Sequence, residues 1–215
     1  MWGQNLRDIS NFALIGHRDF QGFLVTGQNS GTQWLTYMLG LALAKYYDVS
    51  PPRYVNNPSS NEPIAHPKHR RIYPQLPRIA STHSIPHIWR DTPLLRRMVH
   101  FPPYAVLVRD MRDVSVSNFK TYRERYGVPS SEYLKGEPAG NRYVIDIWWY
   151  MHFLNRWGRV IERFPEQTLV SRYDDMTQDP KHELEKLCRY FGLKLKAEAF
   201  DYAVAESFKG KCSAT

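Results

Sequence analysis

The sequence has only two cysteines, Cys188 and Cys212, among its 215 residues. So few thiols exclude a small disulfide-stabilised fold and favour a reducing compartment, so we predict a cytoplasmic protein. No apolar run reaches the roughly 18 residues that a membrane-spanning helix needs. The longest run, residues 35–44, is interrupted by Thr36 and Gly40. The N-terminus also lacks the charged, apolar and small-residue succession of a secretory signal, so we expect neither secretion nor a membrane span.

Acidic residues are in the minority, with 21 Asp and Glu against 29 Lys and Arg, which gives a formal charge of +8. The sequence has no long basic tail, zinc-finger pattern or basic zipper, so we expect a small anionic ligand rather than nucleic acid as the partner. The 42% of hydrophobic residues supports a real core. We predict one domain over residues 1–215, with an irregular insert at about 50–77 that holds seven of the fifteen prolines. The oligomeric state stays open.

Short apolar runs alternate with helical stretches along the chain. The runs predict strands at residues 22–26, 78–82, 104–108 and 167–171. The helical patterns predict helices at residues 32–47, 94–99, 112–126, 143–164, 180–191 and 197–208. This alternation is typical of an α/β fold, in which helices cover both faces of a central, mostly parallel sheet.

Three of the predicted strands end in polar residues that can bind or react. The turn at residues 27–32 (Gly-Gln-Asn-Ser-Gly-Thr) follows the first strand, His83 follows the second and Arg109 follows the third. Ligands of parallel sheets bind beyond the carboxyl ends of the strands. We therefore expect these three segments to share one crevice.

The turn at residues 27–32 joins a strand to a helix in a way that can hold an anion. Its backbone N–H groups and the helix N-terminus attract negative charge, and Ser30 and Thr32 add hydroxyl groups. A tight connection without a ligand explains the turn as well. A Walker A loop needs G-x-x-x-x-G-K-[ST], and here the lysine is absent and the glycine spacing is one residue short. The order G-x-x-S-G also differs from the G-x-S-x-G of serine hydrolases.

Segments from about residue 22 to about 208 resemble a known family, the sulfotransferases that use 3′-phosphoadenosine 5′-phosphosulfate (PAPS). The family's 5′-phosphosulfate loop is similar to VTGQNSGTQWL (25–35), and its catalytic-histidine segment is similar to STHSIP (81–86). Its 3′-phosphate motif is similar to VRDMRDVSVSNF (108–119). A later helix is similar to IDIWWYM (145–151), and the YEDL-type segment is similar to RYDDMTQDPKHELEKLCRYFGL (172–193). The resemblance implies a three-layer α/β fold like that of P-loop NTPases. It also implies transfer of a sulfuryl group from PAPS, which leaves 3′,5′-diphosphoadenosine (PAP), to a small-molecule hydroxyl or amine.

The resemblance also implies a role for individual residues. His83 is the general base, which takes the acceptor's proton as its oxygen or nitrogen attacks sulfur. The residues implied to bind the 5′-phosphate are Gln28, Asn29, Ser30, Gly31, Thr32 and Gln33. Trp34 is implied to stack on the adenine. Arg109 and Ser117 are implied to bind the 3′-phosphate. Phe20, Trp89, Tyr104 and the insert are candidates for the acceptor pocket, and no metal is implied.

Each of these residues also has an ordinary structural explanation. Trp34 lies at helical spacing and suits core packing, Arg109 suits a surface ion pair, and Ser117 suits an exposed helix face. His83 suits a buried or capping histidine. With His87 it also forms an i, i+4 pair that suggests zinc, but no Glu follows His83, so the H-E-x-x-H pattern is not met.

The sequence departs from the family at two places. Asn29 stands where the family has Lys or Arg, and its amide carries no charge to stabilise the leaving phosphate oxygen. Lys68, Arg70 and Arg71 in the insert are candidates to supply that charge. At the C-terminal end, Lys209 and Lys211 stand in place of the family's Arg-Lys-Gly-x-x-Gly loop over the 3′-phosphate. A non-catalytic PAP-binding protein and a kinase-like phosphotransferase therefore remain as alternatives.

Overall fold

The computed structural model describes residues 20–53, 63–64, 71–86, 101–139 and 142–213, with side chains as far as Lys209. The helix predicted at residues 94–99 lies outside the described residues. So do the candidate residues Lys68, Arg70, His87 and Trp89, and the side chain of Lys211.

The four strands form one sheet in which every neighbouring pair is parallel. They are β1 (Gly22–Thr26), β2 (Ile79–Thr82), β3 (Tyr104–Val108) and β4 (Thr168–Arg172), in the spatial order β2-β1-β3-β4. Each lies within one residue of its predicted range, so the strand predictions are confirmed. Because all four run the same way, their carboxyl ends meet at one edge of the sheet.

Five helices follow the sequence pattern. They are α2 (Thr32–Tyr47), α4 (Met111–Tyr126), α6 (Ile147–Arg163), α8 (Pro180–Tyr190) and α9 (Ala197–Ser213). Helix α6 begins at Ile147 rather than at the predicted residue 143, because the side chain of Asp146 accepts a hydrogen bond from the Trp149 amide at 2.9 Å and caps the helix. The short elements α5 (Ser130–Tyr133), η3 (Pro165–Gln167) and α7 (Tyr173–Gln178) were not predicted.

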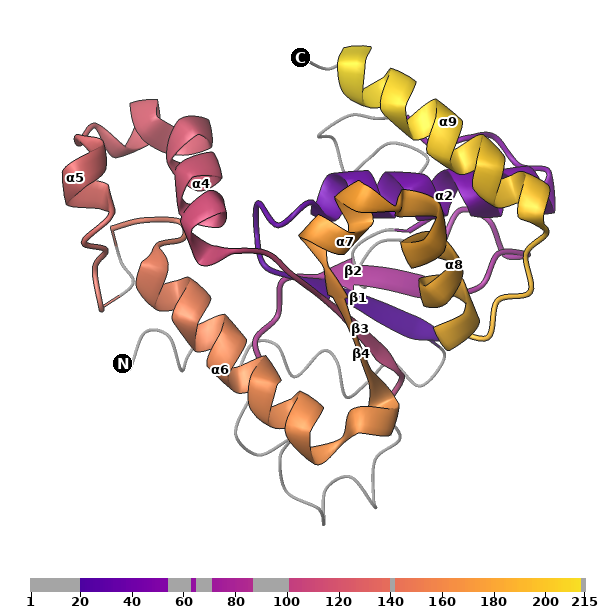
Figure 1. Cartoon of the computed structure of the whole chain (residues 1–215), viewed down its shortest axis with the longest axis horizontal. Coiled ribbons are helices and arrows are strands. Elements are labelled where there is room, and N and C mark those ends of the chain that lie inside the picture. The colour runs from indigo at the N-terminus through magenta and orange to yellow at the C-terminus, as the bar shows by residue number, and fades with distance from the viewer. Residues whose placement is uncertain (1–19, 54–62, 65–70, 87–100, 140–141, 214–215) are drawn as a thin grey trace.

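Helices cover both faces of the sheet and make three layers (Figure 1). Phe23 and Val25 of β1 pack in one core cluster with Phe153 and Trp157 of α6. Leu24, which lies between them, faces the other way and joins the cluster built with α2, α8 and α9. This alternation buries every residue of β1 and confirms the predicted α/β architecture.

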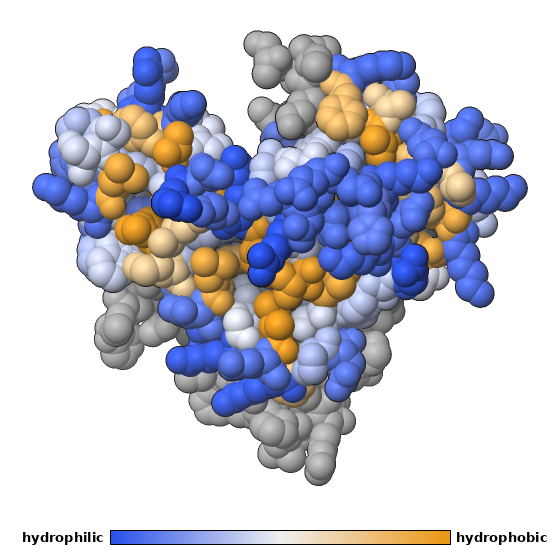
Figure 2. All heavy atoms as spheres, in the orientation of Figure 1, coloured by the Kyte–Doolittle hydropathy of each residue, from blue (hydrophilic) through white to orange (hydrophobic). Residues whose placement is uncertain are grey.

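The carboxyl edge of the sheet faces the gap between α4 and α2 in Figure 1. The space-filling view shows an indentation of the surface beside α4, with hydrophilic side chains over much of the face (Figure 2). Among the described residues, no helix is both long enough and apolar enough to cross a membrane.

Candidate functional site

The turn between β1 and α2 presents an open helix N-terminus. Helix α2 begins after Gly31 with no side-chain cap and no acidic residue in its first turn. Two residues of the turn have left-handed backbones, Asn29 with φ 59° and Gly31 with φ 95°. A Cβ on Gly31 would lie 2.6 Å from the Tyr173 ring, so only glycine fits there. A helix N-terminus with neither a side-chain cap nor an acidic residue in its first turn favours an anion nearby.

His83 follows β2 and lies against the end of β1. Its Nδ1 is 2.8 Å from the backbone carbonyl oxygen of Thr26, and because a carbonyl only accepts, Nδ1 carries the hydrogen. The lone pair of the neutral ring is then on Nε2. Thr26 Oγ1 is also 2.7 Å from Thr32 Oγ1, in the first turn of α2. Thr26 thus joins the histidine to the turn.

The surroundings of His83 favour its neutral form. Although the residue as a whole is exposed, its Nδ1 lies against Thr26, 2.8 Å from the carbonyl oxygen and 3.2 Å from Oγ1. Desolvation of the imidazolium by this protein lowers the pKa of His83 below its usual 6.5, while the hydrogen bond to the Thr26 carbonyl acts in the opposite direction and raises it. A neutral imidazole at physiological pH is the form that can accept a proton.

Arg109, at the end of β3, points its guanidinium at the same turn. Its Nη1 donates to the Asn29 carbonyl oxygen at 3.2 Å, and the guanidinium lies 4.2 Å from the centre of the Tyr173 ring. Asp113 is 4.0 Å from Nε, which is too far for a hydrogen bond. The buried Nε has no hydrogen-bond partner among the described residues. A buried, unpartnered cationic donor beside an open helix N-terminus suits an anionic ligand.

Helix α6 contacts all three of these segments. Tyr150 Oη lies 3.2 Å from Ser30 Oγ in the turn and 3.0 Å from the carbonyl oxygen of Arg109. One heptad later, Trp157 Nε1 donates to the carbonyl oxygen of Ser84, next to His83, at 3.0 Å. No role for Tyr150 is predicted by the sequence motifs. Its spacing of seven residues from Trp157, which places both on one face of the helix, was the signal available.

The side chain of Asn29 is engaged by helix α4. Its Nδ2 donates to Oδ1 of Asn118 at 2.9 Å. Asn118 has no exposed surface, and its own Nδ2 lies 2.7 Å from Tyr133 Oη and 2.8 Å from the carbonyl oxygen of Ile145. The Asn29 amide is therefore held inside a buried network. Neither Asn118 nor this network is predicted by the sequence motifs.

Trp34 is 4% exposed, and its Nε1 donates to Ser207 Oγ of α9 at 3.2 Å. That position agrees with the core-packing alternative, so adenine stacking by Trp34 stays a prediction. Ser117 is half-buried in the second turn of α4. Lys209 is exposed on α9, where an ion pair with Glu206 at 2.6 Å raises the pKa of Lys209.

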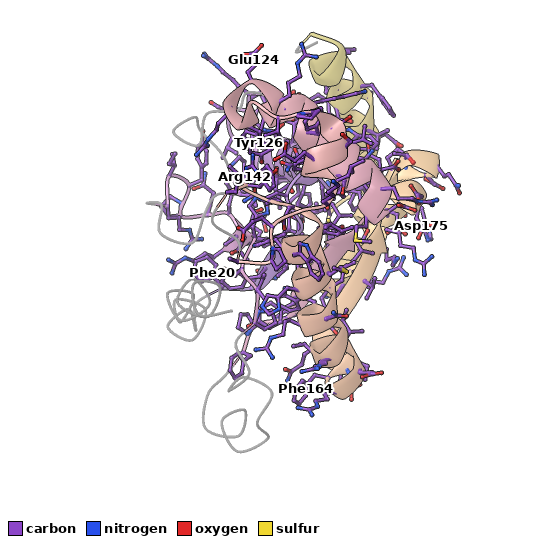
Figure 3. The ribbon with its side chains drawn as sticks, turned by 90° about the vertical axis from the view of Figure 1, so that its left-hand side faces the viewer. Phe20, Glu124, Tyr126, Arg142, Phe164 and Asp175 are labelled. Carbon is purple, nitrogen blue, oxygen red and sulfur yellow. The ribbon has the colours of Figure 1, made fainter. Side chains whose placement is uncertain are left out.

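Of the candidates for the acceptor pocket and for the substitute cation, Phe20, Tyr104 and Arg71 lie among the described residues. Phe20 and Tyr104 are buried, and Tyr104 begins β3, at the edge of the sheet opposite the site. Figure 3 shows Phe20 well away from Tyr126 at the end of α4. The Arg71 guanidinium donates to carbonyl groups of its own loop, including that of Tyr73 at 3.2 Å. Among the described residues, Arg109 places its guanidinium against the turn.

Within the described part of the chain, no cluster of three or more His, Cys, Asp or Glu side chains is arranged to hold a metal ion.

Comparison with known proteins decides the family. The sulfotransferase domain family matches residues 19–213. The chain belongs to the sulfotransferase family. It is 27% identical to the 3-beta-hydroxysteroid sulfotransferase of Cavia porcellus over 95% of this chain and 69% of the relative. It is also 27% identical to cytosolic sulfotransferase 3 of Arabidopsis thaliana over 79% of this chain and 52% of that protein.

Solved sulfotransferase structures share the fold. A mouse sulfotransferase complexed with PAP matches with a TM-score of 0.59 at 17% identity, over 92% of this chain and 70% of that one. Retinol dehydratase in complex with androsterone and PAP matches with a TM-score of 0.56 at 16% identity, over 94% of this chain and 69% of that one. The family resemblance, the fold class and the assignment to the sulfotransferase enzymes are confirmed.

Proposed function

We propose that this sulfotransferase transfers a sulfuryl group from PAPS to a hydroxyl or amine of a small molecule, with His83 as general base. The observation that carries the proposal is the hydrogen bond from His83 Nδ1 to the Thr26 carbonyl, which leaves the Nε2 lone pair to accept a proton. The histidine lies beside the 27–32 turn, the N-terminus of α2 and Arg109, which together we call the anion cradle. PAPS supplies the sulfuryl group when it is bound. Nucleotide binding, orientation of the ligand and removal of the acceptor's proton are carried out by side chains and backbone groups of the protein.

The residues of the cradle fit a doubly phosphorylated nucleotide. The uncapped N-terminus of α2, with no acidic residue in its first turn, suits the 5′-phosphate. The Arg109 guanidinium, with its unpartnered buried Nε, suits the 3′-phosphate because a planar, permanently charged fork can bind two oxygens. The PAP in the related solved structures supports this ligand. Gln28, Gln33, Trp34, Ser117 and Lys209 are proposed as further contacts.

The base acts through its position and its pKa. The Thr26 carbonyl fixes both the tautomer and the orientation of the His83 ring. The lowered pKa keeps the ring neutral at physiological pH, so it can take the proton of an attacking hydroxyl or amine. Steroid alcohols are the first acceptors to test, because the relative in Cavia porcellus is named for a hydroxysteroid.

The test is release of PAP from PAPS by the purified chain across a panel of alcohols, phenols and amines. His83→Ala should lower kcat by about 10²-fold or more, the usual contribution of a general base, and leave the Kd for PAP unchanged in calorimetry. His182→Ala, at an exposed histidine of α8, is the matched control and should keep full turnover. Full turnover by His83→Ala would refute the base assignment.

A non-catalytic PAP-binding role is the second candidate, and one observation favours it. Asn29 replaces the family's lysine or arginine, and its amide is held by Asn118 instead of being free to stabilise a leaving group. Tight binding of PAP with no transfer to any acceptor in the panel would establish that role. Turnover that depends on His83 would exclude it.

A further inference from the structure

The hydroxyl group of Tyr150 lies between the turn and the end of β3. The residue is 1% exposed. Its Oη has contacts at 3.2 Å with Ser30 Oγ, at 3.2 Å with the backbone nitrogen of Arg109 and at 3.0 Å with the carbonyl oxygen of Arg109. The two segments proposed to hold opposite ends of the nucleotide therefore meet at one oxygen atom.

The direction of each hydrogen bond follows from counting donors. A phenol has one hydrogen to donate. The Arg109 carbonyl can only accept, so it receives the Tyr150 hydrogen. The Arg109 N–H can only donate, so Tyr150 Oη accepts from it. With its one hydrogen committed, Tyr150 Oη must also accept from Ser30, whose own hydroxyl hydrogen then points at α6 and not at the cradle.

The ring of Tyr150 fixes the turn as firmly as its hydroxyl does. A Cβ added to Gly27 would lie 2.3 Å from the ring atom Cε2 of Tyr150, so the turn's backbone packs directly on the aromatic face. Ser30 is fully buried. The position of Ser30, and with it that of the neighbouring N–H groups, is thus set by helix α6.

We propose that Tyr150 is a positioning residue that fixes the separation between the 27–32 turn and Arg109, and so makes the site select a nucleotide with both a 5′- and a 3′-phosphate. This inference rests on the proposed function, because it takes the turn and Arg109 as the two phosphate-binding segments. It assigns Ser30 a role through Tyr150 rather than as a direct phosphate donor.

The test compares the affinities for PAP and for adenosine 5′-monophosphate, which lacks the 3′-phosphate. The ratio of the Kd for adenosine 5′-monophosphate to the Kd for PAP, measured by calorimetry, isolates the benefit of the 3′-phosphate. A loss of folded protein does not change this ratio. Tyr150→Phe keeps the ring and should reduce this ratio by about tenfold, as expected for loss of a buried hydrogen-bond partner. Tyr104→Phe removes the hydroxyl of another buried tyrosine, at the opposite end of β3, and should keep the wild-type ratio.

Ser30→Ala provides a second route, and it decides the matter if circular dichroism shows that Tyr150→Phe is unfolded. A serine that acts through Tyr150 lowers the ratio when it is replaced, whereas a serine that binds the 5′-phosphate directly weakens both ligands equally and leaves the ratio unchanged. An unchanged ratio in the folded variants overturns this inference alone. A wild-type chain that binds PAP no tighter than adenosine 5′-monophosphate overturns the proposed function, and this inference with it.

Discussion

His83 Nδ1 lies 2.8 Å from the carbonyl oxygen of Thr26, the last residue of the neighbouring strand β1. A single backbone acceptor thereby selects the tautomer of a side chain 57 residues away in sequence. The contact also connects His83, the candidate base, to β1, the strand that leads into the 27–32 turn.

The pH dependence of turnover should report the environment of His83. A general base works only when it is unprotonated, so activity falls as the pH drops through its pKa. Because desolvation lowers the pKa of His83 below 6.5, the midpoint of the fall in kcat/KM on acidification should lie below pH 6.5. A midpoint above 6.5 contradicts the assignment. PAP binding, measured over the same pH range, separates this effect from titration of the ligand.

Asn29→Lys should raise kcat by at least about tenfold, because it places a positive charge where the family resemblance implies one and where the present amide has none. Steady-state kinetics with a fixed acceptor measures the change. Asn29→Gln, which lengthens the side chain without adding charge, is the control and should give no increase. Equal rates for the lysine and glutamine variants would contradict the expectation that a missing charge at position 29 limits turnover.

Two glycine-to-alanine substitutions should have opposite effects on stability. Gly31→Ala forces a left-handed backbone on alanine and drives its Cβ into the Tyr173 ring, so the free energy of unfolding should fall by about 1–3 kcal/mol. Gly158→Ala lies in α6, where a Cβ meets nothing within 4 Å, and should raise it by about 0.5–1 kcal/mol. Urea denaturation of both variants, followed by circular dichroism, provides the comparison. Stabilisation by Gly31→Ala would contradict the described geometry of the turn.

Asn118→Leu should lower the free energy of unfolding by about 2–3 kcal/mol, because it removes the buried Nδ2 donor that Asn118 shares between the Tyr133 hydroxyl and the Ile145 carbonyl, and leaves that carbonyl with the Tyr133 hydroxyl as its donor. It should also weaken PAP binding, since Asn29 loses the partner that holds its side chain. Val116→Ala, at an exposed position of the same helix, should change stability by less than about 0.5 kcal/mol. A stable Asn118→Leu variant with unchanged PAP affinity would refute a positioning role for this network.

The burial of Tyr133 has a consequence for spectroscopic titration. Desolvation raises the pKa of Tyr133 to about 12, even though its hydrogen bond with Asn118 acts in the opposite direction. The Tyr133 phenol should therefore stay neutral at pH values where exposed tyrosines ionise. Asn118→Leu should change the high-pH end of the ultraviolet titration curve, and Val116→Ala should not.

Local pattern was enough to predict the strands and the longer helices, because their apolar spacing decides which face is buried. The strand from Gly22 to Thr26 and the glycine turn after it were found this way. The parallel topology then places the turn, His83 and Arg109 at one edge. These are properties of short segments and of the order of elements.

The links between those segments were not visible in the sequence. Tyr150 reaches Ser30 across 120 residues, and Asn29 reaches Asn118 across 89. Neither pair has a spacing rule, since tertiary packing alone brings them together. The same holds for Trp34, whose burial against Ser207 depends on where α9 packs. The residues proposed to carry the chemistry were predicted from local motifs, whereas Tyr150 and Asn118, which contact them through tertiary packing, were not.

The arrangement of the candidate site depends on helix α6, which comes later in the sequence than the segments it contacts. Its residues from Tyr150 to Trp157 touch the glycine turn, the end of β3 and the segment after His83, all of which precede it in sequence. A nascent chain that has reached only residue 140 contains every proposed phosphate ligand except Lys209, but it lacks the Tyr150 hydroxyl that links Ser30 in the turn to the end of β3. Selective binding of the doubly phosphorylated nucleotide should therefore emerge during synthesis only after α6 has docked, which makes ligand capture a reporter of that step.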